Sequence, residues 1–141
     1  MRVLVDTKLL LDVLARRDEF YDASARIWTL AERGEIEAFI SAISFNHVYY
    51  IIRKARDKTT ADTAMKLLRD VFDSVAPDTR IVNQAIDSEF GDFEDALQFH
   101  SAVRCHADHI ITRNPGDFPT TKPAVLTPEE FLAFWIEDIN S

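Results

Sequence analysis

The chain has 141 residues, of which 47% are hydrophobic and 28% are charged, and its formal net charge is −8. These values are typical of one folded domain and exclude a disordered chain, while the acidic balance excludes broad, non-specific binding to nucleic acid, which needs a positive footprint. No apolar run approaches the roughly 20 residues of a membrane span, and the first strand leaves no room for a signal peptide. The single cysteine, Cys105, cannot form an internal disulfide. We therefore expect a cytoplasmic protein with no membrane contact.

The chain opens on a short apolar run that ends in an acid. Residues 3–5 are typical of a buried strand that delivers Asp6 to its carboxyl end, and the Leu-rich segment 9–14 then begins a helix. Asp6 therefore stands at a strand-to-helix junction, which is where open α/β sheets keep their chemistry. The alternative is that Asp6 or Thr7 only caps the helix.

Helical and strand patterns alternate through the middle of the chain. Apolar spacing predicts a helix over 20–33 that Gly34 ends, followed by a strand over 37–41. Ser44 is then expected to cap a helix that carries its apolar residues on one face and His47 on the opposite face. The most regular helical spacing runs over 59–72.

The second half of the chain continues this alternation. A brief strand or connector at 74–77 precedes a helix capped by Asp78, and strands are predicted at 109–112 and 124–126. The acidic segment 92–95 opens a helix whose predicted apolar stripe is Phe93, Ala96, Leu97 and Val103. A capping box at Thr127 begins the last helix, which is expected to bury Phe131, Phe134 or Trp135, and Ile136. The order of elements predicts a single domain, 1–141, of the α/β class: a three-layer α/β/α sandwich around a central parallel sheet of four to five strands.

Three acids are predicted to meet at one edge of this sheet. Asp6 follows the first strand, Asp117 follows the strand that ends at Thr112, and Asp95 lies in the first turn of a helix, on a face opposite the apolar stripe. Three carboxylates brought together repel one another unless a cation neutralises them, and their hard oxygen atoms favour Mg²⁺ or Mn²⁺. The sequence therefore predicts a metal site.

Each of these residue patterns also has a structural explanation. The acids at 92–95 compensate a helix dipole, and Asp117 is an ordinary turn residue. The basic clusters at 16–17 and 53–58 are typical of solvated helix ends. His100, His106 and His109 do not share a helix face and have no cysteine pair beside them, which disfavours a zinc site.

Four short motifs give the chain a resemblance to a known family. They are Val-Asp-Thr-Lys-Leu-Leu-Leu-Asp at 5–12, Ile-Ser-Ala-Ile-Ser-Phe-Asn-His-Val-Tyr-Tyr at 40–50, Asp-Phe-Glu-Asp-Ala at 92–96 and Ile-Thr-Arg-Asn-Pro-Gly-Asp-Phe at 111–118. Each motif alone is weak, but their order and positions resemble the PIN-domain family, and more narrowly its small bacterial VapC-like toxins.

The resemblance implies a metal-dependent ribonuclease, the toxin of a toxin–antitoxin pair. Asp6, Asp95 and Asp117 would hold one or two Mg²⁺ or Mn²⁺ ions that activate water for attack on an RNA phosphodiester. The resemblance also implies that Thr112 and Asn114 orient ligands or water and that Arg113 touches a phosphate. Two kinds of partner are implied as well, an antitoxin whose basic tail enters the acidic groove and a second copy of the chain in a homodimer.

Two residues depart from the motifs of this family. Lys8 stands where the opening motif usually has Asn, and His47 stands where the second motif often has Glu. A lysine cannot accept a hydrogen bond, and a neutral imidazole removes one negative charge from the pocket. The alternative function is therefore a degenerate PIN fold with weak or no metal binding that acts as an RNA-binding or regulatory protein. A haloacid-dehalogenase-type phosphotransferase is disfavoured, because it would need an acid where Lys8 stands.

Overall fold

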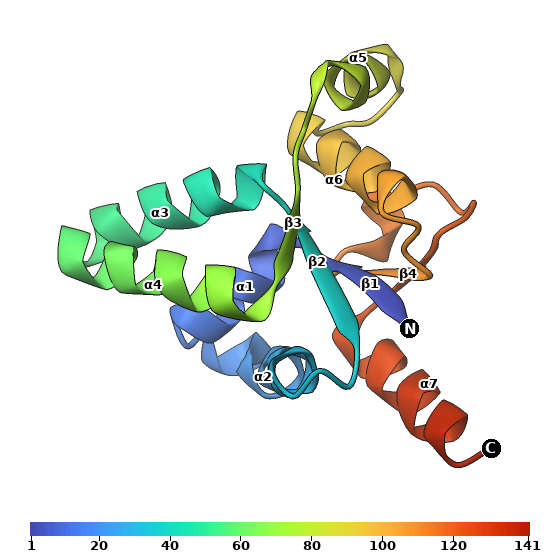
Figure 1. The fold of residues 1–141 in the computed structure, drawn as a ribbon, viewed down its shortest axis with the longest axis horizontal. Coiled ribbons are helices and arrows are strands. Elements are labelled where there is room, and N and C mark those ends of the chain that lie inside the picture. The colour runs from blue at the N-terminus through green and yellow to red at the C-terminus, as the bar shows by residue number, and fades with distance from the viewer.

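A five-stranded parallel sheet forms the centre of the protein, which a computed structural model describes over residues 1–141 (Figure 1). In spatial order the strands are β3 (Asp73–Val75), β2 (Glu37–Ser41), β1 (Arg2–Val5), β4 (His109–Ile111) and β5 (Ala124–Leu126). Leu4 of β1 lies opposite Phe39 on one side and Ile110 on the other. The strand order places β1 in the middle, so the chain's first acid follows the central strand.

Seven α-helices cover the two faces of this sheet. They are α1 (Thr7–Leu14), α2 (Asp18–Glu32), α3 (Ile43–Ala55), α4 (Lys58–Val71), α5 (Thr79–Asp87), α6 (Phe93–Arg104) and α7 (Pro128–Ile139), and a single 3₁₀ turn, Pro115–Asp117, joins β4 to β5. The predicted three-layer α/β/α architecture is confirmed.

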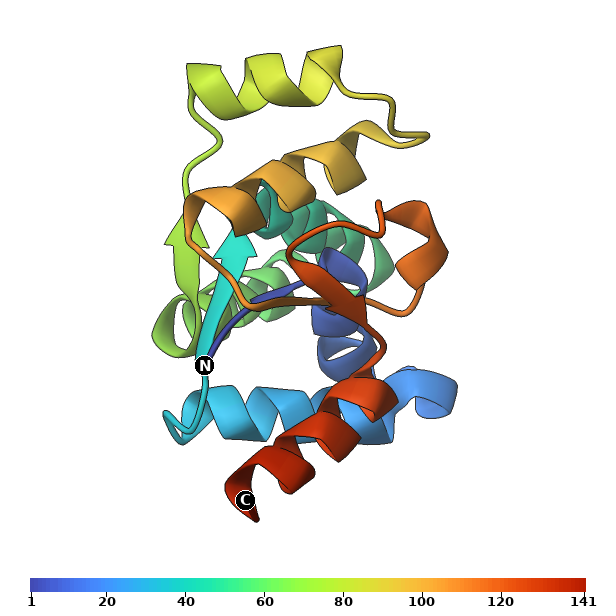
Figure 2. The same ribbon diagram turned by 90° about the vertical axis from the view of Figure 1, so that its right-hand side faces the viewer.

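The alternation of side chains along β1 separates two hydrophobic cores. Val3 and Val5 point to the larger core, which includes residues of α1, α2, α3, α4 and α7. Leu4 points to the other face, where it packs with Ala102 of α6. Helix α5 lies on the outer side of α6, away from the sheet, and α7 runs beside α2 (Figure 2). A strand buried on both faces explains why the opening run of the sequence is continuously apolar.

Most predicted caps are present, with one exception. Asp78 accepts a hydrogen bond from the Ile81 amide, and Thr127 forms a complete capping box with Glu130. Ser44, however, does not cap α3, since the cap position is Ala42 and has no side-chain hydrogen bond. The Ser44 hydroxyl is buried and lies 2.6 Å from the hydroxyl of Thr7, so it joins α3 to α1 instead.

Two predicted apolar stripes are partly wrong. On α6, Phe93 and Val103 are exposed, and the buried face carries Asp95 and Gln98 together with Ala96, Leu97, Ser101 and Ala102. On α7, Phe131 and Leu132 are buried, whereas Phe134 and Ile136 are exposed. Helix α6 packs on the two smaller hydrophobic clusters and α7 on the large one, and each helix also exposes apolar side chains, so hydrophobicity alone does not decide which side faces inward.

Two aromatic side chains of α2, Phe20 and Trp28, make contacts within the chain. Trp28 packs edge-on against Phe72 with 5.0 Å between ring centroids, and Arg113 lies 3.9 Å above the ring of Phe20. Trp28 therefore packs against the protein's own core, while the ring of Phe20 is covered by a guanidinium group. None of the helices combines the length and the apolar character that crossing a membrane demands.

Candidate metal and phosphodiester site

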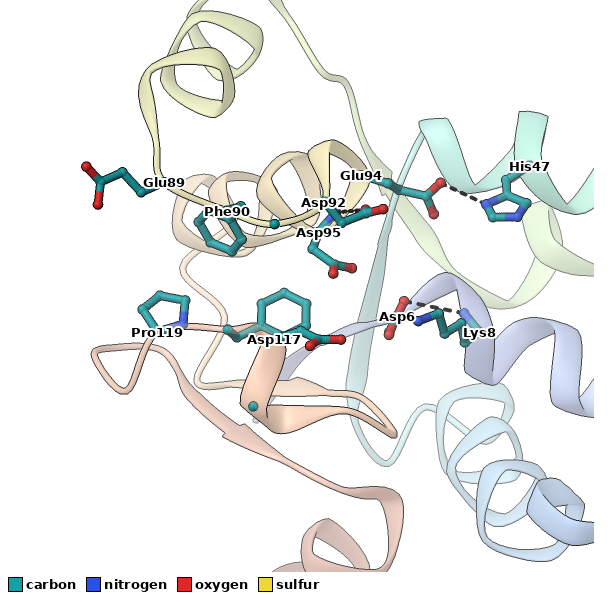
Figure 3. A pocket seen from close by; sticks show the side chains of 13 residues that line it. Asp6, Lys8, His47, Glu89, Phe90, Asp92, Glu94, Asp95, Asp117 and Pro119 are labelled. Atoms are coloured by element: carbon teal, nitrogen blue, oxygen red, sulfur yellow. Dashed lines mark hydrogen bonds and ion pairs between the residues drawn. The ribbon is translucent and has the colours of Figure 1, made fainter.

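An acidic cleft of about 880 Å³ opens at the carboxyl ends of β1 and β4 (Figure 3). The Asp6 amide donates to the Ile111 carbonyl, which places the end of β1 beside Thr112. The cleft is lined by Asp6, Lys8, His47, Glu89, Phe90, Gly91, Asp92, Glu94, Asp95, Gly116, Asp117, Phe118 and Pro119. Six of these residues are acidic and one is a lysine, so the cleft is an environment for cations.

The Asp6 carboxylate is held at both oxygens on the cleft floor. Gln98 Nε2 donates to Oδ1 over 3.1 Å, and Thr112 Oγ1 donates to Oδ2 over 2.7 Å. The backbone amide of Asn114 in turn donates to Thr112 Oγ1 over 3.2 Å. Asp6 also caps α1, accepting a hydrogen bond of 3.4 Å from the Lys8 amide, so it has both the capping role and the place in the cleft. Its side chain is 2% exposed, so its orientation is set by these donors before any ligand binds.

Asp95 faces Asp6 across the cleft from the first turn of α6. Asp92 caps this helix by accepting from the Asp95 amide at 3.0 Å. Burial, followed by the negative charges of Asp6, Asp92 and Asp117, raises the pKa of Asp95 to about 7, while Lys8 opposes the shift. Burial and the neighbouring carboxylates both disfavour the charged form of Asp95, and a nearby cation would favour it.

Asp117 approaches the same space from the 3₁₀ turn after β4. It is exposed, in contrast to the two buried acids. Figure 3 shows the carboxylates of Asp6, Asp95 and Asp117 directed toward one another. Three segments far apart in the sequence thus bring their acids to one opening.

The donor chemistry of this cleft fits a hard divalent cation. Carboxylate oxygens are the ligands that Mg²⁺ and Mn²⁺ prefer, and burial together with neighbouring negative charges raises the pKa of Asp95, an effect that a bound cation would oppose. The spacing is less favourable, since no group of three or more His, Cys, Asp and Glu side chains stands close enough to hold a metal ion. The residues therefore match the ion in kind, but the side chains as they stand are not a closed coordination cage.

The two residues that depart from the PIN motifs both line the cleft. His47 Nδ1 lies 2.7 Å from Glu94 Oε1, so its ring is engaged with α6. Lys8 has no ion-pair partner within 4.0 Å and is near enough to Asp95 to lower its pKa. Sequence reasoning treated Glu94 only as a dipole-compensating acid and did not foresee its pairing with His47.

The buried polar residues behind the cleft form one network. Thr7 is 1% exposed, and its amide donates to Gln98 Oε1 over 3.0 Å. Gln98 therefore contacts both Thr7 and Asp6, and sequence reasoning missed it. Its position three residues after Asp95 places the two on one helix face, and that spacing was the signal that could have identified it.

Arg113 does not line the cleft. Its Nε lies 2.8 Å from Asp12 Oδ2, its guanidinium covers Phe20, and Arg17 approaches the other Asp12 oxygen at 3.8 Å. The 2.8 Å contact joins opposite charges and is an ion pair with a fully buried carboxylate. Arg113 thus fastens the segment that begins at Thr112 to α1 and α2, and the exposed Asn114 contributes its backbone amide.

Comparisons with known proteins place these features in context. A family model described as "PIN domain" matches residues 2–115. No curated protein sequence gives a significant match. Among solved structures, VapBC2 from Rickettsia felis bound to a promoter DNA fragment is 14% identical, with a TM-score of 0.66 and coverage of 89% of this chain and 97% of that one.

Two further structures are similar over most of the chain. A toxin–antitoxin complex from Klebsiella pneumoniae is 22% identical, with a TM-score of 0.67, and the match covers 89% of this chain and 97% of that one. VapC20 of Mycobacterium tuberculosis, a Sarcin-Ricin loop cleaving toxin, is 16% identical, with a TM-score of 0.63 and coverage of 77% and 86%. At these identities the likeness establishes a shared fold.

Proposed function

The chain belongs to the PIN-domain family, and on that premise we propose that it is a metal-dependent endoribonuclease, the toxin of a toxin–antitoxin pair. The observation that carries the proposal is the convergence of Asp6, Asp95 and Asp117 on one acidic cleft. The raised pKa of Asp95 supports it, because acids crowded in this way need a cation.

Each acid has a separate part in this proposal. Asp6, held by Gln98 and Thr112, is the central ligand of Mg²⁺ or Mn²⁺, Asp95 supplies the second carboxylate, and Asp117 acts directly or through a water. When bound, the ion lowers the pKa of a water and stabilises charge on the scissile phosphate. Lys8 is the one lysine or arginine of the cleft, and it is placed to contact a substrate phosphate.

Metal binding can be tested without knowing the RNA. Calorimetry with Mn²⁺ on the wild type and on Asp95→Asn should give saturable binding that the substitution abolishes. Asp138→Asn, which removes an exposed acid of α7, is the matched control and should bind as the wild type does. Equal binding by the wild type and Asp95→Asn would remove Asp95 from the metal site.

Cleavage is tested with a 5′-labelled single-stranded RNA of mixed sequence. With Mn²⁺ the wild type should cut it, and Asp6→Asn should lose at least about a hundredfold of the rate, because it removes the central carboxylate. Persistent cleavage by Asp6→Asn at the wild-type rate would contradict the assignment.

The second candidate function rests on Lys8 and His47. In that case the fold binds RNA but holds metal weakly, because the imidazole pairs with Glu94 instead of adding a charge. His47→Glu separates the candidates. A gain in Mn²⁺ affinity would place position 47 at the metal site, while no Mn²⁺ binding by the wild type even at millimolar concentration would favour the non-catalytic function.

We also propose a protein partner with a basic tail. The structurally similar Klebsiella and Rickettsia proteins are complexes of toxin and antitoxin. A cleft with six acidic residues is complementary to an arginine or lysine side chain. A homodimer is proposed as well, acting on RNA in the cytoplasm, and light scattering of the purified chain would measure its mass.

A further inference from the structure

The acidic cleft cannot by itself attract an RNA strand. It holds six carboxylate residues and one lysine, while single-stranded nucleic acid is bound through cations that track its phosphates. With a net charge of −8 spread over the chain, an RNA substrate needs a local positive footprint next to the cleft.

The C-terminal end of α3 carries such a footprint. Arg53, Lys54 and Arg56, hereafter the basic tip, are exposed, and none of them forms an ion pair with an acid. The other helices with a basic residue in the last turn are α4 and α6, where Arg69 and Arg104 each pair with an aspartate. Arg53 donates to the Tyr49 hydroxyl over 3.3 Å, but all three cations of the basic tip are without an acidic partner, which sets this helix end apart from the other two.

One face of α3 joins the basic tip to the cleft. His47, Tyr50 and Lys54 are spaced by three and four residues, so they lie in one row on the helix. His47 lines the cleft, Tyr50 is 61% exposed, and Lys54 Nζ lies 5.9 Å from the centre of the Tyr50 ring. Figure 3 shows His47 of α3 at the cleft, and Figure 1 shows the far end of α3 at its connection to α4.

The length of this row suits a nucleic-acid strand. From His47 to Lys54 the helix rises about 10 Å, which is roughly three nucleotides of a stacked strand. An exposed aromatic ring followed by cations provides a stacking platform and phosphate contacts in the order that a single strand needs. An acidic protein segment would use the cations but would leave the ring without a stacking partner.

We propose that a single-stranded RNA extends from the cleft along the row His47, Tyr50 and Lys54 of α3. One base of the RNA stacks on Tyr50, and the phosphates of the RNA contact the basic tip. The proposal rests on the proposed function, because it takes the cleft as the place where the phosphodiester sits. It adds a binding surface outside the cleft that no metal ligand shares.

The first test measures RNA binding without cleavage. Fluorescence anisotropy in EDTA would follow a labelled eight-nucleotide RNA on the wild type and on Arg53→Glu/Lys54→Glu/Arg56→Glu. The control, Arg33→Glu/Arg80→Glu/Lys122→Glu, makes the same change in net charge at exposed residues of other elements. We expect the dissociation constant to rise at least tenfold for the basic-tip variant and less than threefold for the control. The slope of log K against log salt should fall by about two.

Length and stacking give independent measurements. A two-nucleotide RNA should be bound alike by the wild type and by the basic-tip variant, because it is shorter than the roughly three nucleotides that separate His47 at the cleft from Lys54. Tyr50→Ala, which removes an exposed ring without touching the core, should weaken binding of the eight-nucleotide RNA about tenfold. Equal losses in the basic-tip variant and the control, or displacement of the RNA by poly-glutamate as effective as by unlabelled RNA, would overturn the proposal.

Failure of the two proposals can be told apart. RNA binding that depends on the basic tip, in a protein that never cleaves with Mn²⁺, would leave this surface in place and overturn the nuclease. If the basic-tip variant cleaves the eight-nucleotide RNA at the wild-type rate, the nuclease proposal stands and the proposed RNA surface on α3 is overturned. Unchanged Mn²⁺ calorimetry in that variant would show that its fold and cleft are intact.

Discussion

Single residues of the cleft differ in how firmly they are held. Asp6 is fixed by donors from Gln98 and Thr112, while Asp95 lies among negative charges. Asp6 is oriented before any ligand binds, whereas the charged form of Asp95 is disfavoured until a proton or a cation neutralises it. Stability measurements on the metal-free protein can therefore detect the unfavourable environment of the charged Asp95 carboxylate.

Asp95→Asn should stabilise the metal-free protein in a pH-dependent way. The folded-state pKa of about 7 exceeds the ordinary 3.8, so the stability that protonated Asp95 contributes is complete below pH 4 and is lost as the pH rises through 7. Relative to the wild type, the variant should gain on the order of 2 kcal/mol at pH 8 and nearly nothing at pH 4. Urea denaturation in EDTA measures both values, and an equal gap at the two pH values would contradict the electrostatic cause.

Arg113→Ala should destabilise the protein by about 3 kcal/mol at pH 8, because it leaves Asp12 buried without its nearest cation. Burial already raises the pKa of Asp12 despite Arg113 and Arg17. The loss should therefore shrink in acid, where a protonated Asp12 needs no partner. Arg113→Lys is the control that keeps the charge. A penalty as large at pH 4 as at pH 8 would assign the effect to lost packing on Phe20.

Individual elements meet at the cleft through a few buried polar contacts. Gln98 of α6 contacts the end of β1 and the start of α1, and Ser44 joins α3 to α1 through Thr7. Such contacts fix the position of α6, and with it Asp95, more sharply than apolar packing does. Gln98 thus connects the helix that carries Glu94 and Asp95 to the end of the central strand.

Gln98→Leu should lower stability by roughly 2 kcal/mol, because it leaves the buried Thr7 amide without Gln98 Oε1 and removes the shorter of the two hydrogen bonds to Asp6 Oδ1. The same change should weaken Mn²⁺ binding about tenfold, as is usual when a residue that orients a ligand is lost. Gln84→Leu on the exposed side of α5 is the matched control. Full Mn²⁺ affinity in a destabilised Gln98→Leu would limit Gln98 to a structural role.

The whole molecule should respond to metal as one cooperative unit. Mn²⁺ that binds only the folded chain adds about 2.7 kcal/mol to the free energy of unfolding when its concentration is a hundred times the dissociation constant. For a domain of this size, that raises the Tm by roughly 5 to 10 °C. Thermal unfolding with Mn²⁺ and then with EDTA measures this shift. Asp95→Asn should show no rise, and a rise equal to that of the wild type would place the ion elsewhere.

The amino-acid sequence by itself determined the elements and the layer architecture. Apolar spacing and caps are local properties, so β2 and β5 begin and end where the pattern predicts, and Asp78 and Thr127 cap the helices they precede. The order of strands and helices then leaves few ways to cover a parallel sheet. Family membership followed from four short motifs, because their residues lie at the ends of those elements.

Only the tertiary structure decided which side chains face one another. Three outcomes depended on contacts between segments far apart in the chain. Arg113 lies against Asp12 and not in the cleft, Glu94 pairs with His47, and Phe93 is exposed. Local sequence carries no record of those distances. Charge and burial are properties of the assembled cleft, and so is the raised pKa of Asp95, which comes first from burial and then from the negative charges of neighbouring acids.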